Sequence, residues 1–63
     1  SAAYLAAKRK VRAVAGLAWP EFGKKLGDYL LRKGFGYETA SSIAKRLWNE
    51  LHQGEVEDQE AFD

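Results

Sequence analysis

The block of residues 29–37 most constrains what this chain can fold into, because it predicts the end of one helix, a tight turn and the start of another. Gly34 can adopt the left-handed conformation that closes a helix, since it has no side chain to clash. If Gly34 is the first residue beyond the helix, a Schellman-type cap would place Phe35 against Leu30. Gly36 then opens the next helix. The block therefore predicts two helices held at a fixed angle.

Apolar residues recur at helical spacing on both sides of this turn, which predicts helices over residues 2–15, 20–33 and 37–52. Ser1 is the predicted N-cap of the first helix. The residues predicted to be buried are Tyr4, Ala7, Val11, Val14, Ala18, Phe22, Leu26, Tyr29, Leu30, Ala40, Ile43, Ala44, Leu47 and Leu51. No segment has the alternating pattern of a strand, so the sequence predicts an all-α, small three-helix domain.

The beginning of the second helix contains a proline and two glycines. Pro20 suits a first helical turn and is expected to keep Trp19 out of the helical region. Gly23 and Gly27 lie four residues apart on one side of the helix. They either allow another backbone to approach closely or mark a first turn that frays. We favour fraying, with regular helix beginning nearer Lys24.

The length of 63 residues allows one small domain, which buries only about 60% of its unfolded surface. The absence of cysteine excludes a disulfide framework and a cysteine-based zinc site. No apolar run approaches the roughly 20 residues needed to cross a bilayer, so no membrane contact is predicted. We expect a cytoplasmic protein.

The net charge of +1 conceals a segregation of charge along the chain. Residues 1–54, the predicted domain, carry ten basic and four acidic side chains, a net charge of +6. Residues 55–63 carry five acidic side chains and no basic one, and we expect a disordered acidic tail there. A basic body suggests contact with an anionic partner, and the alternative is a set of solvated helix faces.

The residues that catalysis requires are sparse. His52 is the only histidine, lies near a predicted helix end, and has no cysteine to activate. Ser41 and Ser42 have no histidine nearby in the sequence, and the glycines fit no phosphate-binding loop. We therefore expect no enzymatic activity, no cofactor, no metal and no small-molecule substrate.

A nucleic-acid-binding function has more support. The second and third predicted helices resemble a helix-turn-helix, but Glu38 would face the phosphates and the first two turns of the third helix contain no Arg or Lys. The basic side chains of the first two helices remain able to contact phosphates without sequence preference. The sequence thus favours sequence-neutral over base-specific contacts.

Several residues of the turn and its flanking helices resemble a repeat of RecX, a bacterial regulatory protein family. The matching residues are Tyr29, Leu30, Arg32, Lys33, Gly34, Phe35 and Tyr37, followed by Ile43 and Leu47. Together with the basic helix before them, they extend the resemblance over about residues 4–52. The resemblance implies one three-helix repeat of the C-terminal type. It also implies a module that modulates RecA by docking on the RecA–single-stranded-DNA filament in recombination and SOS repair.

A basic body would meet the anionic nucleoprotein filament through its exposed cations. The residues predicted to bind the partner are Arg9, Arg12, Lys25, Arg32 and Lys33. One alternative is a helical domain that binds DNA directly, in a sequence-neutral manner and without RecA. Another is an inert structural repeat whose basic residues serve solubility.

Overall fold

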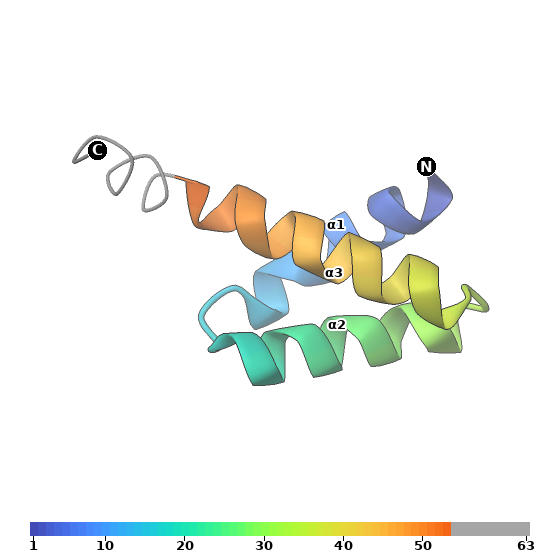
Figure 1. Ribbon diagram of the computed structural model, residues 1–63, viewed down its shortest axis with the longest axis horizontal. Coiled ribbons are helices and arrows are strands. Elements are labelled where there is room, and N and C mark those ends of the chain that lie inside the picture. The colour runs from blue at the N-terminus through green and yellow to red at the C-terminus, as the bar shows by residue number, and fades with distance from the viewer. Residues whose placement is uncertain (54–63) are drawn as a thin grey trace.

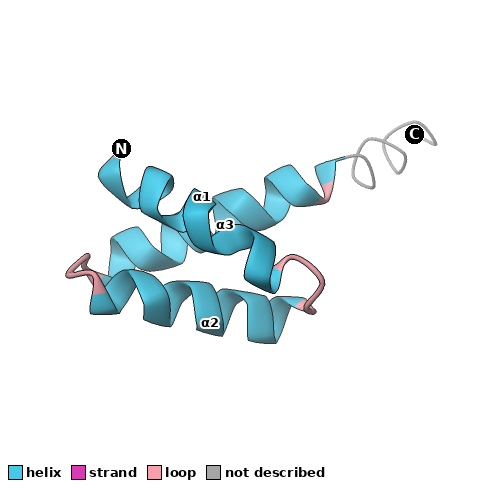
Figure 2. Cartoon of the chain, turned by 180° about the vertical axis from the view of Figure 1, so that it is seen from behind, coloured by secondary structure: helices cyan, strands magenta, loops and turns pink. Residues whose placement is uncertain are grey.

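The computed structural model describes residues 1–53, which form three helices joined by short connections (Figure 1). The helices are α1 (Ala2–Val14), α2 (Trp19–Arg32) and α3 (Tyr37–Leu51). The described residues contain no strand (Figure 2), which confirms the predicted all-α three-helix domain. The expected acidic tail over residues 55–63 lies outside the described part of the chain.

Helix α1 begins as predicted and differs from the prediction at its end. The Ser1 Oγ accepts a hydrogen bond from the Tyr4 amide at 3.2 Å, which confirms the N-cap. The helix ends at Val14, one residue earlier than expected. Its buried stripe includes Ala3, which the prediction missed, and excludes Ala18, which is exposed because it is the N-cap of α2.

Helix α2 begins one residue before the proline, so the prediction that Trp19 lies outside the helix is wrong. The chain is extended at Ala18 (φ −69°, ψ 164°), and the Phe22 amide donates to the Ala18 carbonyl at 2.8 Å. This hydrogen bond closes the first turn around Trp19, and the turn contains Pro20 as its second residue. The chain therefore changes direction at Ala18, and α2 begins at the next residue.

The expected fraying of this first turn is also wrong. The Trp19 ring stacks on Phe22 at 6.2 Å between centroids and meets Trp48 of α3 edge-on at 5.6 Å. A Cβ at Gly23 would lie only 3.1 Å from the Trp19 indole. The ring occupies the space that any larger residue at position 23 would need, and these contacts hold the turn in place.

The connection between α2 and α3 is the predicted Schellman turn. Gly34 has φ +100°, its amide donates to the Leu31 carbonyl at 3.0 Å, and the Phe35 amide donates to the Leu30 carbonyl at 3.1 Å. These are the two hydrogen bonds that define this cap. Gly36 is the N-cap of α3, as predicted, and its carbonyl accepts from the fourth residue of that helix at 2.9 Å.

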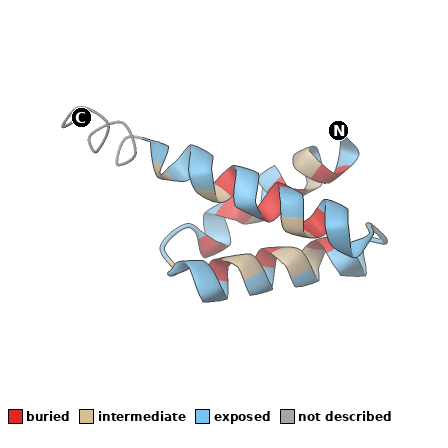
Figure 3. Cartoon of the chain, in the orientation of Figure 1, coloured by how far each residue is buried: buried red, intermediate tan, exposed pale blue. Residues whose placement is uncertain are grey.

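The core lies where the inner faces of the three helices meet (Figure 3). It consists of Ala3, Ala7, Val11, Val14, Phe22, Leu26, Leu30, Ala40, Ile43, Ala44 and Leu47. Tyr29 packs at the edge of the core and is only partly buried. Leu51, predicted to be buried, is 45% exposed because α3 diverges from α2 toward its C-terminal end (Figure 1).

Candidate anion-binding surface

A groove with a basic border runs between α1 and α2. Helix α2 buries Phe22, Leu26 and Leu30, so the residues beside this stripe face the neighbouring helices. On the side toward α1 they meet residues from the second half of that helix and from the connection after it. The groove is lined by Lys10, Ala13, Val14, Leu17, Lys25, Asp28, Tyr29 and Arg32. We call it the α1–α2 groove.

Tyr29 organises the charges of this groove. Its ring is half-buried beside the fully buried Leu30, which fixes it between the two helices. The Nζ of Lys10 lies 5.6 Å from the ring centroid and the Nζ of Lys33 lies 5.4 Å from it. Ammonium groups at this distance are attracted to the aromatic ring. The same ring thus attracts a cation from α1 and a cation from the end of α2.

The groove carries a net positive charge. Within the described part of the chain, four cations border the groove or lie over the Tyr29 ring, namely Lys10, Lys25, Arg32 and Lys33, and the one carboxylate that lines the groove is Asp28. The Asp28 Oδ2 lies 3.5 Å from the Nζ of Lys24 on the same helix, with both side chains largely exposed. An exposed pair of this kind contributes little to stability, but it offsets part of the negative charge of Asp28.

The structure brings together three of the five residues predicted to bind a partner. Lys25 and Arg32 line the α1–α2 groove. Lys33, the C-cap of α2, lies over the Tyr29 ring in this groove. Arg9 and Arg12 are exposed on α1, on the side opposite the buried stripe, and form a separate basic surface. The binding roles of all five stay predictions.

Sequence reasoning missed two residues of the groove. Lys10 precedes the buried Val11 and lies one turn before Val14, which places it at the edge of the stripe. A helical projection of α1 distinguishes it from Arg9 and Arg12 by this criterion. The apolar period of α2 predicts that Tyr29 belongs to the core, and its exposed edge depends on how α1 packs against α2, which no local pattern specifies.

A second polar cluster connects α1 to α3. The Tyr4 hydroxyl donates to Glu50 Oε1 at 2.9 Å, and Arg46 Nε lies 3.5 Å from Glu50 Oε2. The Arg46 guanidinium carbon lies 4.6 Å from the centre of the Tyr4 ring. The hydrogen bond to Glu50, followed by desolvation and the Glu50 charge, raises the pKa of Tyr4, and Arg46 acts in the opposite direction. This cluster fastens the N-terminal half of α1 to the C-terminal half of α3.

The remaining polar groups have structural surroundings. The His52 ring lies on the Trp48 ring at 3.9 Å between centroids, and its Nδ1–H donates to the Trp48 carbonyl at 2.9 Å. His52 is therefore a helix-end residue, as predicted. Within residues 1–53, no three His, Asp or Glu side chains come close enough together to hold a metal ion. None of the three helices is long and apolar enough to cross a membrane.

The fold and this surface together define a small three-helix domain with a basic groove. A family model described as "RecX, third three-helix domain" matches residues 1–44. The chain therefore belongs to the RecX family. The match begins at the N-cap of α1 and ends at Ala44, within α3, whereas the resemblance seen in the sequence extended to about residue 52. Comparisons with curated proteins and with solved structures gave no match.

Proposed function

We propose that this domain is a regulatory, non-catalytic binding module that docks on the RecA–single-stranded-DNA filament. Membership of the RecX family supports this proposal at the level of the module. The observation that supports a particular docking surface is the cluster of cations around Tyr29, which consists of Lys10, Lys25, Arg32 and Lys33. In this proposal the domain acts in the cytoplasm, during recombination and SOS repair.

The physical basis is electrostatic complementarity. Residues 1–53 carry ten basic and four acidic side chains, and a filament of protein and DNA presents many anionic groups. Complementary charge accelerates the encounter, and a cluster with fixed geometry sets the register of the complex. The cations near Tyr29 have this property because the ring restrains two of them. Arg9 and Arg12 enter the proposal as a second contact on the outer side of α1.

A second candidate function is direct, sequence-neutral binding of DNA without RecA. It is favoured by the surplus of exposed Lys and Arg on both sides of α1, since phosphate contacts of this kind need no base recognition. The third hypothesis, an inert structural repeat, assigns the same cations to solubility alone.

A binding titration separates the three hypotheses. The fluorescently labelled domain is titrated with RecA–single-stranded-DNA filaments and with the same DNA alone, each at two salt concentrations. Docking on the filament predicts tighter binding to filaments than to bare DNA, with an affinity that falls as salt rises. Equal affinity for both would replace the proposal with direct DNA binding. Binding to neither would leave the inert repeat.

A further inference from the structure

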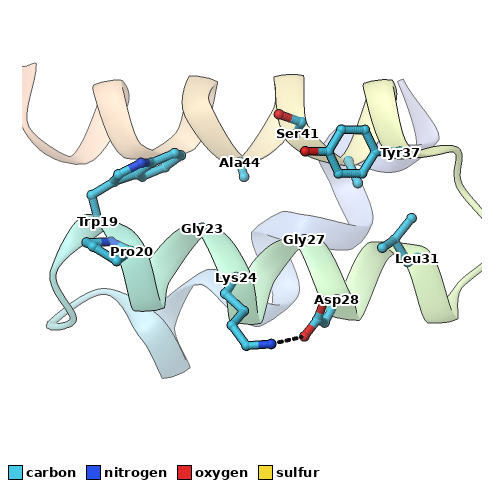
Figure 4. A pocket seen from close by; sticks show the side chains of 11 residues that line it. Trp19, Pro20, Gly23, Lys24, Gly27, Asp28, Leu31, Tyr37, Ser41 and Ala44 are labelled. Carbon is cyan, nitrogen blue, oxygen red and sulfur yellow. Dashed lines mark hydrogen bonds and ion pairs between the residues drawn. The ribbon is translucent and has the colours of Figure 1, made fainter.

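The opposite side of α2 carries a groove with different chemistry. Between α2 and α3, a groove of about 330 Å³ has a floor of small residues, namely Gly23 and Gly27 from α2 with Ala40, Ser41 and Ala44 from α3 (Figure 4). A Cβ at Gly27 would meet nothing within 4 Å, so the floor is open at this residue, whereas the Trp19 indole covers Gly23. We call it the α2–α3 groove.

Large apolar side chains stand at both ends of this groove. Trp19 lies at one end, and Leu31 and Tyr37 lie at the other (Figure 4). They are 36%, 42% and 74% exposed, and they are three of the five large hydrophobic residues exposed in residues 1–53. Exposed apolar residues that gather on one surface mark an interaction site more often than residues scattered singly.

The charges around the groove indicate what kind of partner it accepts. Among residues 1–53, the only charged residues that line it are Lys24 and Asp28, which pair with each other at 3.5 Å, so this part of the lining has no net charge. The rest of residues 1–53 is strongly basic. A face without net charge gives an anionic partner no electrostatic advantage, and two copies of the basic residues 1–53 repel each other least here.

The groove is also complementary to itself. A two-fold interface uses the same patch on both copies, so the patch must carry both projections and hollows. Trp19 and Leu31 lie twelve positions apart on α2, and the open floor at Gly27 lies between them. If two α2 helices lie antiparallel across a two-fold axis near the middle of the groove, each Trp19 meets the Leu31 and Tyr37 end of the other copy.

The same axis brings opposite charges together. Lys24 and Asp28 lie about one turn apart on one edge of α2, and the middle of the groove falls between them (Figure 4). The two-fold operation therefore places Lys24 of each copy near Asp28 of the other. From these relationships we infer that the α2–α3 groove is a self-association surface, which takes a second copy of this chain as an antiparallel two-fold dimer.

Sedimentation equilibrium of the full chain over a range of concentrations tests this inference. The expected result is a mass that rises from 7.1 kDa toward twice that value. The assay contains neither RecA nor DNA, so failure of the dimer and failure of anion binding through the α1–α2 groove are distinguishable. A constant mass of 7.1 kDa at all concentrations would overturn the inference.

A pair of variants with equal charge tests the location. Gly27→Lys fills the open floor and should weaken the dimer about tenfold or more, because an overfilled contact cannot close. Leu5→Lys adds the same charge at an exposed apolar residue of α1 outside the groove and should leave most of the association intact. Equal weakening by both would overturn the assignment to this groove. Circular dichroism establishes that each variant remains helical.

A charge exchange tests the two-fold geometry. Lys24→Asp alone places two carboxylates where the inferred dimer has an opposite pair and should weaken association. Adding Asp28→Lys restores an opposite pair between the copies and should recover the affinity. Failure of the double variant to recover it, while remaining helical, would exclude the antiparallel arrangement.

Discussion

The Phe35 amide donates to the Leu30 carbonyl at 3.1 Å, across the turn that joins α2 to α3. The same carbonyl also accepts from the Lys33 amide at 3.1 Å, and the hydrogen bond from Phe35 draws the chain back over the end of α2. Phe35 then packs against the core beside Leu30, which is fully buried. The direction of α3, and with it the width of the α2–α3 groove, follows from this turn.

The turn depends on the left-handed conformation of Gly34. With φ at +100°, an L side chain at this position is strained even though a Cβ would meet no neighbouring atom. We expect Gly34→Ala to lower the free energy of unfolding by about 1–2 kcal/mol, and Gly34→Asn to lower it less, since asparagine tolerates this region better. Urea denaturation followed by far-UV circular dichroism measures both. Equal stability of Gly34→Ala and the unchanged chain would refute the role given to this backbone conformation.

Burial separates two phenylalanines that the sequence alone does not rank. Phe22 is completely buried among the three helices, whereas Phe35 is partly exposed at the turn. Phe22→Ala should cost about 3–5 kcal/mol, which is enough to unfold a domain whose total stability lies near the lower end of about 5–15 kcal/mol. Phe35→Ala should cost about 1–2 kcal/mol and leave a cooperative transition. Thermal unfolding of both variants checks this order.

Features that depend on neighbouring residues could be predicted from the sequence, whereas features that depend on contacts between helices could not. The cap at Gly34 and Phe35 could be predicted, since its hydrogen bonds join residues within one turn of the chain. The helical start at Trp19 could not, because contacts with Trp48 of α3 hold the indole in place. Leu51 fits the apolar period of α3, but periodicity does not show where the neighbouring helices diverge.

The candidate site follows the same division. The exposure of Lys25, Arg32 and Lys33 follows from their positions around α2, so all three could be predicted as partner-binding residues from the sequence. The meeting of Lys10 with the Tyr29 ring depends on the rotation of α1 against α2, which is a property of packing. Local patterns therefore identified Lys25, Arg32 and Lys33, and they missed Lys10 and the aromatic ring that it shares with Lys33.

The two glycines of α2 should respond differently to alanine. Gly27 lies inside the helix with open space around its would-be Cβ, so Gly27→Ala should raise stability by about 0.5–1 kcal/mol. At Gly23 the new methyl group would lie 3.1 Å from the Trp19 indole, and the ring must shift. Gly23→Ala should therefore raise the stability less than Gly27→Ala does, or lower it. The comparison uses melting temperatures at low protein concentration, where about 1 kcal/mol corresponds to 4–8 °C.

The contact between Tyr4 and Glu50 predicts a change in titration. The pKa of Tyr4 is raised above its ordinary value of 10.0, first by the hydrogen bond to Glu50. Glu50→Ala should lower the pKa of Tyr4 toward that value, and Glu38→Ala, at the far end of α3, should not. Because the folded state holds the proton more tightly, this contribution to stability is complete below the unfolded pKa and is lost as pH rises through the folded pKa. The chemical shift of the Tyr4 ring carbon that bears the hydroxyl, followed by NMR as pH is raised, measures this pKa directly.

The α1–α2 groove makes the most specific prediction about binding. Lys25→Ala and Lys45→Ala each remove one exposed lysine and change the net charge equally, but Lys25 borders the groove and Lys45 lies on α3. If the groove contacts DNA phosphates in the filament, Lys25→Ala should flatten the plot of log affinity against log salt by about 0.7, the value for one phosphate contact on a single strand. Lys45→Ala should leave the slope unchanged.

Tyr29→Leu completes this test, because it keeps every charge and removes the ring that restrains Lys10 and Lys33. If arrangement matters as well as net charge, the affinity for filaments should fall while the salt slope stays nearly constant, since the same cations remain to displace counterions. Unfolding of the variant by urea must match that of the unchanged domain within about 1 kcal/mol for the comparison to stand. Equal affinity of the Tyr29→Leu domain and the unchanged domain would show that charge alone governs docking, and the restrained pair of lysines would then have no part in recognition.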